Sequence, residues 1–384
     1  MRRSGEIFAR AKANARGVTD DELAQLRQAC PRALTHNLRP TMRAALTQLA
    51  EDTPDDVAFD VYGTGAWLAA FEGRIARELG KDAAVFMPTG TLAQLTALRI
   101  WCDRIGVPTI AFHPTCHLEI WEARSYAMLH GLRALLVGNA TRLMTASDVA
   151  SIVDPLGAFL IELPQREIGG QLLPWDDLVA LCDAARATGA RLHLDGARLW
   201  ETTPFYERSL AEIASLFDSV YVSFYKGLGG LTGAMLAGDA DFIAEARVWQ
   251  HRHGGRPFTI APYAISAERG FERNFPKMRA YRDRAVAIAA ALETLPGVDV
   301  VPSPPQTNTF HVFLRGSKDG LEARAHAYAA RTGTFVFARL APTVVPQVQK
   351  WEFVVGDATM TLDAQTVVDA VRATLGAATV APER

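Results

Sequence analysis

Two places in the chain bring charged side chains to the ends of apolar runs. Asp195 and Arg198 follow RLHL (191–194), and Lys226 follows SVYVSF (219–224) and precedes a group of glycines. A lysine amine can form a Schiff base with a carbonyl compound, and a carboxylate can keep a heterocyclic nitrogen protonated. The same residues could instead be a surface ion pair and a lysine that extends from a strand end into water.

The segment PTGT (88–91) has the chemistry of an anion site. Small residues at the start of a helix let a phosphate approach the backbone N–H groups, and the hydroxyls of Thr89 and Thr91 add donors beside Gly90. The alternative is an ordinary helix cap. Together with a carboxylate and a lysine at neighbouring strand ends, a phosphate site completes the set of groups that pyridoxal phosphate (PLP) requires.

The glycine-rich segment KGLGGLTG (226–233) differs from the common nucleotide-binding motifs. Its lysine precedes the glycines, whereas the lysine of a P-loop follows them. Gly227, Gly229 and Thr232 also miss the last glycine of the G-x-G-x-x-G pattern. These differences disfavour a nucleotide-binding fold.

The segment HPTCHLE (113–119) contains three side chains of zinc-ligand type, His113, Cys116 and His117. Pro114 disfavours a regular helix that carries both histidines, and no fourth ligand is evident nearby. We therefore expect no metal. Two other interpretations of His117 stay open: a histidine that packs or caps, and a ring that stacks on a cofactor.

The elements that must position these residues alternate between short apolar runs and helix-length amphipathic segments, from about residue 60 to 290. This alternation predicts an α/β fold, a mostly parallel seven-stranded sheet with helices on both faces. Ligands bind outside the carboxyl ends of such strands, so we expect the polar clusters to converge there. The expected strands are AAVFM (83–87), PTIAF (108–112), RALLV (133–137), AFLIEL (158–163), RLHL (191–194), SVYVSF (219–224) and GAMLAG (233–238). The last should be antiparallel, because its connection is too short for a crossover helix.

The chain is expected to have three parts. Residues 1–57 form an N-terminal helical or extended segment, 58–290 a large domain, and 291–384 a smaller α+β domain. The small domain should contain strands at VDVVP, TNTFHVFL, TFVFA and KWEFVVG, with helices over 320–332 and near 364–375. The first thirty or so residues look helical and should pack on the small domain or on a partner subunit.

Composition favours an ordinary cytoplasmic enzyme. The chain has 384 residues, 40 Lys+Arg against 42 Asp+Glu, and a net charge of -2, which argues against nucleic-acid or membrane-surface binding. No apolar run reaches the ~18 residues of a spanning helix, and the N-terminus lacks the apolar core of a signal peptide. The 4 cysteines are widely spaced, as reduced thiols would be.

Several segments together resemble the threonine aldolase/β-eliminating lyase family of fold-type I PLP enzymes, over roughly residues 58 to 315. Asp195 and Lys226 are 31 residues apart, which is the family's spacing. The resemblance implies a PLP-binding large domain of the transferase-like fold and a smaller C-terminal domain. The matching segments are DVYGTGAWLAAFEGRIAREL, AAVFMPTGT, HLEIWE, GGQLLP, HLDGARLWE, KGLGGLTGAMLAG and QTNTFHVFL.

The resemblance also implies roles for individual residues. Lys226 would be the Schiff-base lysine, and Asp195 would pair with the ring nitrogen of the cofactor. Arg198 would face the phenolic oxygen of the ring or the substrate carboxylate. His117, with Glu122 five positions on as in the family, would stack over the ring. The phosphate would be held by Thr89, Gly90 and Thr91, together with Ser223.

The chain departs from the family where the substrate should bind. LTHNLRPT (34–41) lacks the family's serine and offers Thr35 or His36, and Gln165 stands where the family commonly has a histidine. The segment KWEFVVGDATMTLD lacks the family's arginine, for which Arg339 or Arg166 is the candidate replacement. The candidate substrate residues are therefore Arg198, Gln165, Arg166 and Arg339.

The resemblance implies cleavage of the Cα–Cβ bond of a β-hydroxy-α-amino acid to glycine and an aldehyde, with His117 or a water that it orders as the base. Elimination of a β leaving group is the alternative, and a non-catalytic or zinc-binding protein is the third hypothesis. A homodimer or homotetramer with shared active sites is expected. In RVWQHRHGGRPF (247–258), Arg252 or Arg256 would reach a neighbour's phosphate, unless the segment is simply an exposed basic loop.

Overall fold

The computed structural model describes residues 18–37 and 40–376. The chain divides into two compact units, one of residues 48–278 and one of residues 1–47 together with 279–384. We call them the large and the small unit. The division into three parts that the sequence suggests (1–57, 58–290 and 291–384) differs from these two units and remains a prediction.

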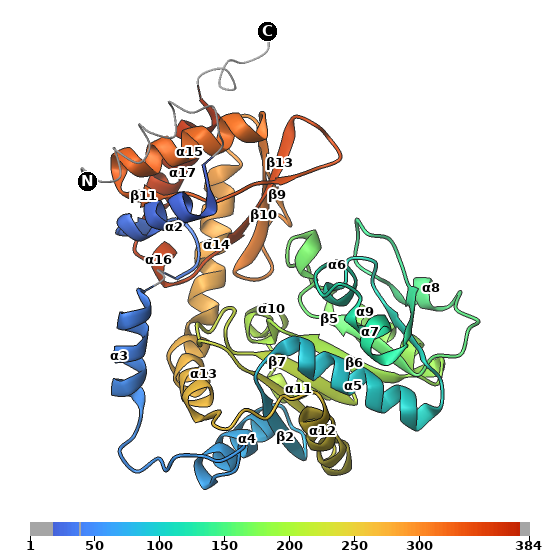
Figure 1. The fold of residues 1–384 in the computed structure, drawn as a ribbon. Coiled ribbons are helices and arrows are strands. Elements are labelled where there is room, and N and C mark those ends of the chain that lie inside the picture. Colours follow the sequence, from blue (N-terminus) through green and yellow to red (C-terminus); the bar gives the residue numbers. More distant parts are fainter. Residues whose placement is uncertain (1–17, 38–39, 377–384) are drawn as a thin grey trace. The chain divides into compact units, whose positions relative to one another are not determined.

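The large unit is built on a seven-stranded sheet (Figure 1). β8 pairs antiparallel with β2 and β7, and the other strand pairs are parallel. The predicted fold class is confirmed, including the antiparallel GAMLAG strand. In spatial order the strands are β2 (Ala83–Met87), β8 (Ala234–Gly238), β7 (Ser219–Ser223), β6 (Arg191–Gly196), β5 (Ala158–Glu162), β3 (Thr109–Phe112) and β4 (Arg133–Leu136).

β6 runs two residues further than its apolar stretch predicts. Asp195 is in register with Glu162 of β5 and Tyr221 of β7, and Gly196 is in register with Val222. Position 196 has no room for a side chain, because a Cβ atom there would lie 2.6 Å from the Tyr221 carbonyl oxygen. The sheet therefore fixes the Asp195 backbone on both sides.

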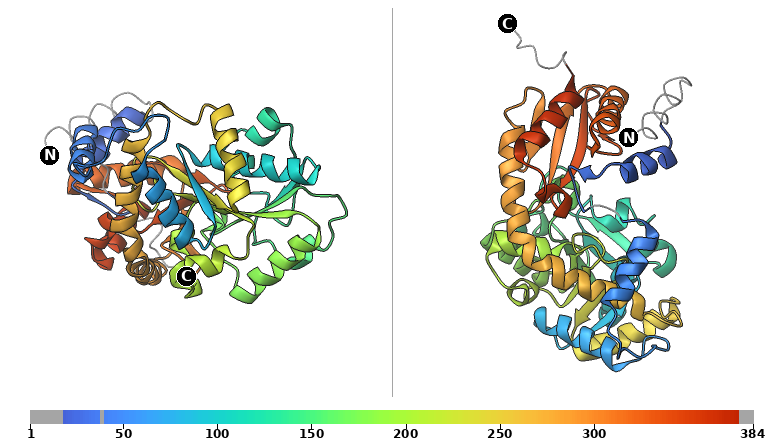
Figure 2. Two further views of the ribbon diagram at one scale, coloured as in Figure 1. Left: turned by 90° about the horizontal axis from the view of Figure 1, so that it is seen from below. Right: turned by 90° about the vertical axis from the view of Figure 1, so that its left-hand side faces the viewer.

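Helices cover both faces of this sheet (Figure 2). α5 (Gly90–Ile105) and α12 (Ala240–Arg252) pack on one face, where the Trp101 and Phe242 rings stack with centroids 4.6 Å apart. α4 (Ala66–Glu78) lies on the other face, with Phe71 against Phe86 of β2. The other helices of the unit are α6 (His117–Ile120), α7 (Ser125–His130), α8 (Ala146–Val149), α9 (Trp175–Ala187), α10 (Thr203–Tyr206), α11 (Leu210–Ala214) and α13 (Ala261–Asn274).

α5 begins within PTGT and is stabilised at both ends. Thr89 is its N-cap, and the Thr89 hydroxyl accepts a hydrogen bond from Leu92 N at 3.2 Å. Gly106 closes the helix in the left-handed conformation at φ 77°. Gln94 and Trp101, seven residues apart, share one side of the helix. Both side chains bond residues of the sheet, so α5 is the element that supports the strand ends from one face.

The small unit contains a four-stranded antiparallel sheet of order β12 (Ala341–Pro342), β13 (Val348–Val354), β10 (Thr309–Arg315) and β9 (Val298–Val301). TFVFA contributes only β11 (Thr334–Phe335), which pairs with β1 (Arg32–Ala33) in a separate parallel sheet. α2 (Asp20–Ala29) packs on α15 (Lys318–Thr332), as the helical N-terminal segment suggests, but residues 1–17 lie outside the described part. Further helices are α14 (Met278–Leu292), α16 (Asp357–Met360) and α17 (Ala364–Leu375), and α3 (Met42–Asp52) spans the boundary between the units.

Within the described residues, no helix has both the length and the apolar character that a bilayer crossing demands.

Candidate active site

Three polar side chains lie side by side at the carboxyl edge of the large sheet. Glu162, Asp195 and Tyr221 are register partners on β5, β6 and β7. Neighbouring strands are about 4.8 Å apart and side chains at one register level share a face, so these residues form a continuous row. We call it the strand-end row. Asp195 and Tyr221 are each 2% exposed, and Glu162 is mostly buried.

The Asp195 carboxylate in this row has a hydrogen-bond donor on each oxygen. Gln94 Nε2 donates to Asp195 Oδ2 at 2.6 Å, and the Ala197 backbone N–H donates to Oδ1 at 3.1 Å. Donors of this kind favour the charged form of a carboxyl group. The structure thus buries a carboxylate at the position where a protonated ring nitrogen would need one.

A second polar level lies one pleat below the row. The Trp101 indole donates to Ser219 Oγ at 2.7 Å, and Ser219 Oγ lies 2.8 Å from His193 Nδ1. The Ser219 hydroxyl thus accepts from the indole and joins Trp101 of α5 to His193 of β6. Burial lowers the pKa of His193 to about 4, so the imidazole is neutral beneath Asp195.

Lys226 comes three residues after β7 and is partly buried. Burial and the nearby Arg198 guanidinium lower the pKa of Lys226 to about 8, although the carboxyl groups of Asp195 and Glu162 oppose this shift. A neutral amine is the form that attacks a carbonyl carbon. The structure therefore brings the predicted lysine, aspartate and arginine together.

Thr89, Gly90 and Thr91, three of the four predicted phosphate-binding residues, form the start of α5, and the fourth, Ser223, ends β7. Thr89 is exposed and its hydroxyl caps the helix, whereas Gly90 is buried against the ring of Tyr221, which leaves no space for a Cβ atom. The N–H groups of a first helical turn have no partner within the helix and point at any anion placed there. The Ser223 hydroxyl is fully buried, and no group in the described part of the chain makes a hydrogen bond of normal geometry to it.

His117 begins α6 and is paired with Glu122, as the family pattern implies. His117 Nδ1 lies 2.9 Å from Glu122 Oε1, and the Glu122 side chain is only 4% exposed. A carboxylate on Nδ1 holds the proton there and leaves Nε2 as the basic nitrogen. The contact with Glu122 is therefore compatible with either role of His117, a base that acts through Nε2 or a ring that stacks on a cofactor.

The zinc alternative has no support in the geometry. His113 Nε2 lies 2.9 Å from the carbonyl oxygens of both Asn139 and Arg142, so that nitrogen is committed to the backbone. Burial raises the pKa of the Cys116 thiol well above its usual value. Over residues 18–37 and 40–376, no cluster of three or more His, Cys, Asp or Glu side chains could hold a metal ion.

Gln165 and Arg166 lie beside the row, directly after β5. Gln165 Nε2 donates to Glu162 Oε2 at 2.9 Å and to Thr115 Oγ1 at 3.1 Å, so its amide is already engaged. Arg166 bonds Glu167 Oε1 at 2.9 Å, and its guanidinium lies 5.7 Å from the Trp121 ring centroid. These contacts place an amide and a cation at the edge of the candidate site.

Two other candidate substrate positions belong to the small unit. Arg339 donates to Val18 O at 2.6 Å and pairs with Asp20 and Glu322 at 3.2 and 3.6 Å. Thr35 is buried, and its hydroxyl lies 3.0 Å from His36 Nδ1. In the large unit Arg198, the remaining candidate, lies near Lys226 and 3.8 Å from Glu201 Oε1.

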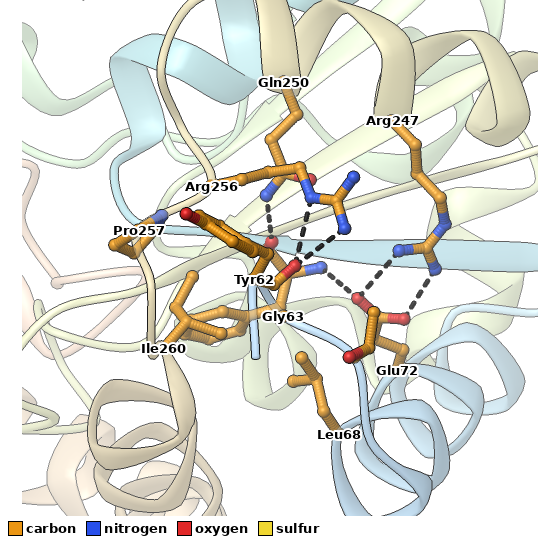
Figure 3. Close-up of a pocket in the computed structure, with 11 residues that line it drawn as sticks. Tyr62, Gly63, Leu68, Glu72, Arg247, Gln250, Arg256, Pro257 and Ile260 are labelled. Atoms are coloured by element: carbon orange, nitrogen blue, oxygen red, sulfur yellow. Dashed lines mark hydrogen bonds and ion pairs between the residues drawn. The ribbon is translucent and has the colours of Figure 1, made fainter. Parts of the chain in front are cut away.

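A pocket of about 180 Å³ also opens in the large unit, lined by α4, α12 and the loops around Tyr62 and Arg256 (Figure 3). Arg247 pairs with Glu72 at 2.6 Å, and Gln250 donates to Phe86 O at 2.8 Å. Arg256 donates to the Tyr62 carbonyl oxygen at 2.7 Å. Arg247, Gln250 and Arg256 of this pocket are thus bonded to Glu72 or to backbone carbonyl oxygens, which is typical of a structural cavity.

Sequence reasoning missed four residues that this geometry brings to the site: Gln94, Glu162, His193 and Tyr221. Three of them had a usable signal, because a residue two positions before Asp195 shares its strand face, and the ends of adjacent strands share a register. Gln94 had a weaker signal, a polar residue on an otherwise apolar face of α5.

The fold and this group of side chains define the class of protein. A mostly parallel seven-stranded sheet, with a lysine beyond one strand and a buried aspartate on its neighbour, is the fold-type I arrangement of PLP-dependent enzymes. The chain belongs to the beta-eliminating lyase family, whose model matches residues 34–317.

Named relatives agree with this assignment. The chain is 28% identical over 283 residues to low-specificity L-threonine aldolase 1 of Arabidopsis thaliana, which covers 70% of this chain and 77% of that protein. A solved structure of a candidate L-allo-threonine aldolase from Listeria monocytogenes EGD-E has 42% identity and a TM-score of 0.87, over 92% of this chain and 98% of its own. A candidate aromatic amino acid beta-eliminating lyase/threonine aldolase from Exiguobacterium sp. 255-15 has 39% identity and a TM-score of 0.86, over 92% and 99%.

Proposed function

We propose that the protein is a PLP-dependent lyase that cleaves the Cα–Cβ bond of a β-hydroxy-α-amino acid to give glycine and an aldehyde. One observation carries the proposal: Lys226, an amine with a lowered pKa, lies one strand away from Asp195, a buried carboxylate with a donor on each oxygen. The family assignment and the names of the relatives point to the same chemistry.

The residues present fit PLP. The buried Ser223 hydroxyl with no normal hydrogen bond is a donor that a phosphate oxygen could use. Gly90 adds no side chain of its own at the helix start beside the Tyr221 ring, and Asp195 offers a charge for a ring nitrogen. The residues that would hold the cofactor are Lys226, Asp195, Arg198, His117, Ser223, Thr89, Gly90 and Thr91.

Bound at the Lys226 amine, PLP supplies an electron sink for negative charge at the α-carbon of an amino acid. The chain's own groups do the rest. His117 Nε2, freed by the hold of Glu122 on Nδ1, accepts the proton of the β-hydroxyl group directly or through a water. Arg198 and Arg166 would hold the substrate carboxylate and so orient the Cα–Cβ bond for cleavage. Gln165 Nε2 is bonded to Glu162 and Thr115, so its amide oxygen would accept a hydrogen bond from the hydroxyl, and an amide cannot act as a base.

The experiment is a labelling and product assay. The protein mixed with PLP should develop a visible absorption band, borohydride should fix the cofactor covalently, and mass spectrometry should find the label on Lys226. The Lys226→Ala variant, checked for folding by circular dichroism, should take no label at that position. Incubation with a β-hydroxy-α-amino acid should release equal amounts of glycine and aldehyde. A wild-type protein that takes no label contradicts the proposal.

Elimination of a β leaving group is the second candidate, favoured by Gln165, whose amide cannot take the proton of a substrate hydroxyl. It would release pyruvate and ammonia from a substrate such as a β-substituted alanine. The two activities are separated by assaying both product pairs on the same preparation.

We also propose that the protein works in the cytoplasm as a homodimer or homotetramer with shared sites. The exposed rings of Phe59 and Tyr62 contact Phe258 at centroid distances of 6.1 and 5.4 Å, an aromatic cluster suited to a subunit interface. Arg252 and Arg256 lie on the same stretch as Phe258, so an interface through Phe258 would bring them near the neighbouring subunit. Analytical ultracentrifugation with and without a Phe258→Glu change tests this assembly, and cell fractionation tests the location.

A further inference from the structure

Glu162 is the member of the strand-end row that the proposed mechanism leaves without a task. It is the register partner of Asp195 on the adjacent parallel strand, so the two carboxyl groups leave one face of the sheet from strands about 4.8 Å apart. Both are buried or mostly buried. Two carboxyl groups in such a position repel each other when both are ionised, so one of them retains a proton well above its ordinary pKa.

Hydrogen bonding decides which of the two keeps the negative charge. Asp195 accepts at 2.6 Å from the Gln94 amide and at 3.1 Å from Ala197 N. Glu162 accepts at 2.9 Å from the Gln165 amide and at 3.3 Å from Arg166 N. Shorter bonds to both oxygens stabilise the ionised form more strongly. This contrast favours Glu162 as the member of the pair that keeps the proton.

The charged groups that face Glu162 do not reverse this outcome. Lys226 beyond β7 and Arg198 beyond β6 favour its ionised form, as does the backbone N–H of Arg166. Burial and the Asp195 carboxylate oppose them and raise the pKa of Glu162 to about 8.

Another neighbour is the Cys116 thiol, which precedes α6. It stays neutral, because burial raises its pKa and the carboxyl groups of Glu162 and Asp195 raise it further. It adds no charge that would draw the proton from Glu162.

We propose that Glu162 is a positioning residue that carries a proton at neutral pH, so that Asp195 is the single negative charge of the strand-end row, and that Gln165 holds the protonated carboxyl group in place. The inference rests on the proposed function only in that Asp195 serves the cofactor ring. Ionisation of Glu162 would add a second negative charge beside a site that must accept an anionic cofactor. Cofactor affinity should therefore fall as the pH rises through the Glu162 pKa.

The first test reads the proton itself and needs no cofactor. An infrared difference spectrum, wild type minus Glu162→Gln, should show the C=O stretching band of a protonated carboxyl group at pH 7. The band should disappear as the pH rises through about 8. Gln165→Leu removes a donor from Glu162 and should move the disappearance to higher pH, which also covers the case in which Glu162→Gln fails to fold. A carboxylate band alone at pH 7 overturns the proposal.

The second test measures PLP affinity against pH. Glu162→Gln resembles the protonated side chain, so its affinity at pH 7 should stay within about 3-fold of the wild type, well under 1 kcal/mol of binding energy. The variant should also lack the loss of affinity at alkaline pH. A tightening of about 10-fold or more at pH 7 would mean that a repelling negative charge had been removed, and would contradict the proposal.

Glu119→Gln is the matched control for this second test. Glu119 is a mostly buried carboxylate outside the row, paired with Arg124 at 2.6 Å, and its loss should leave the pH profile unchanged. If wild-type protein binds no PLP at all, the proposed function fails, while the infrared result still decides the protonation of Glu162.

Discussion

The amide of Gln94 donates a 2.6 Å hydrogen bond to the carboxylate of Asp195, which ties the second turn of α5 to the end of β6. Gln94 is 1% exposed, so water cannot replace this bond. Gln94→Leu should therefore leave a buried charge short of a donor, lower the free energy of unfolding by about 1–3 kcal/mol and weaken PLP binding. Urea unfolding and a PLP titration measure the two effects.

Gln365→Leu is the control for this change. Gln365 donates to Asp369 at 2.8 Å, but on the exposed side of α17, where water can take over the bond. Its loss should cost well under about 0.5 kcal/mol and leave PLP binding unchanged. Equal losses of unfolding free energy in the two variants would show that the buried Gln94 bond contributes no more to stability than an exposed one.

Gly90 lies so close to the Tyr221 ring that a methyl group must displace it. Gly90→Ala should lower stability by about 1–3 kcal/mol through overpacking, and should weaken PLP binding more than this loss explains. Gly65→Ala is a matched control at the start of another helix, because a Cβ atom there meets nothing within 4 Å. Thermal unfolding and PLP titration of both variants are the measurements. Equal behaviour of the two alanine variants would refute the packing argument.

The pair formed by His117 and Glu122 predicts a catalytic effect without a folding effect. Glu122→Gln removes the charge that holds the proton on Nδ1, so the imidazole can present the wrong nitrogen. kcat for the aldol cleavage should fall by about 10²-fold or more, with a smaller change in KM. Glu119→Gln, a neighbour that bonds Tyr126, should keep the wild-type rate. A fall in both variants would point to a local folding defect instead.

Lys226 should react as an unusually acidic amine. Its pKa is lowered to about 8, so its neutral fraction should rise through pH 8, whereas an ordinary lysine becomes neutral near ~10.4. Reductive alkylation of the cofactor-free protein at several pH values, followed by peptide mass spectrometry, measures this fraction. Lys318, an exposed lysine on α15, serves as the internal reference. Parallel labelling curves for the two lysines would exclude the lowered pKa.

His193 should make the protein sensitive to acid. Its pKa is about 4 in the folded state against 6.5 for a free imidazole, so the folded state binds fewer protons than the unfolded state between these values. Stability is therefore present above about pH 6.5 and is lost as the pH falls through 4, by up to about 3 kcal/mol. His193→Gln should flatten this part of the pH–stability curve.

His130 has a similarly lowered pKa of about 4 and contributes to the same window. Urea unfolding of His193→Gln, His130→Gln and the double variant at pH 7 and 4.5 separates the two contributions. An unchanged slope in the His193 variant would contradict its buried neutral state.

The sequence was sufficient for the fold because its pattern was regular. Each of the seven predicted strands occurs within two residues of its expected end, and GAMLAG is antiparallel because a short loop cannot cross a sheet. TFVFA was the exception in the small unit. This segment is as apolar as the other predicted strands, yet only Thr334 and Phe335 form a strand. They pair with β1 and not with the four-stranded sheet of the small unit. A local pattern does not specify the partner of a strand.

The candidate site was only partly predictable for a physical reason. Lys226 and Asp195 belong to recognisable motifs. Gln94 is 101 residues from Asp195 in the sequence, and the residues around either one do not predict their hydrogen bond. Glu162 was overlooked because its importance comes from register: it matters only beside Asp195 on the next strand. Arg339, proposed as a substrate contact, has Asp20 and Glu322 as partners in its own unit, which composition could not reveal.

The strand-end row has a consequence for engineering. Backbone pairing sets the interval between positions 162, 195 and 221, so this interval does not depend on the side chains placed there. Substitutions at these three positions can therefore change the charge of the row without changing the spacing of its backbone positions. A library that varies residues 162 and 221 and keeps Asp195 therefore explores the electrostatics of the site at constant backbone spacing.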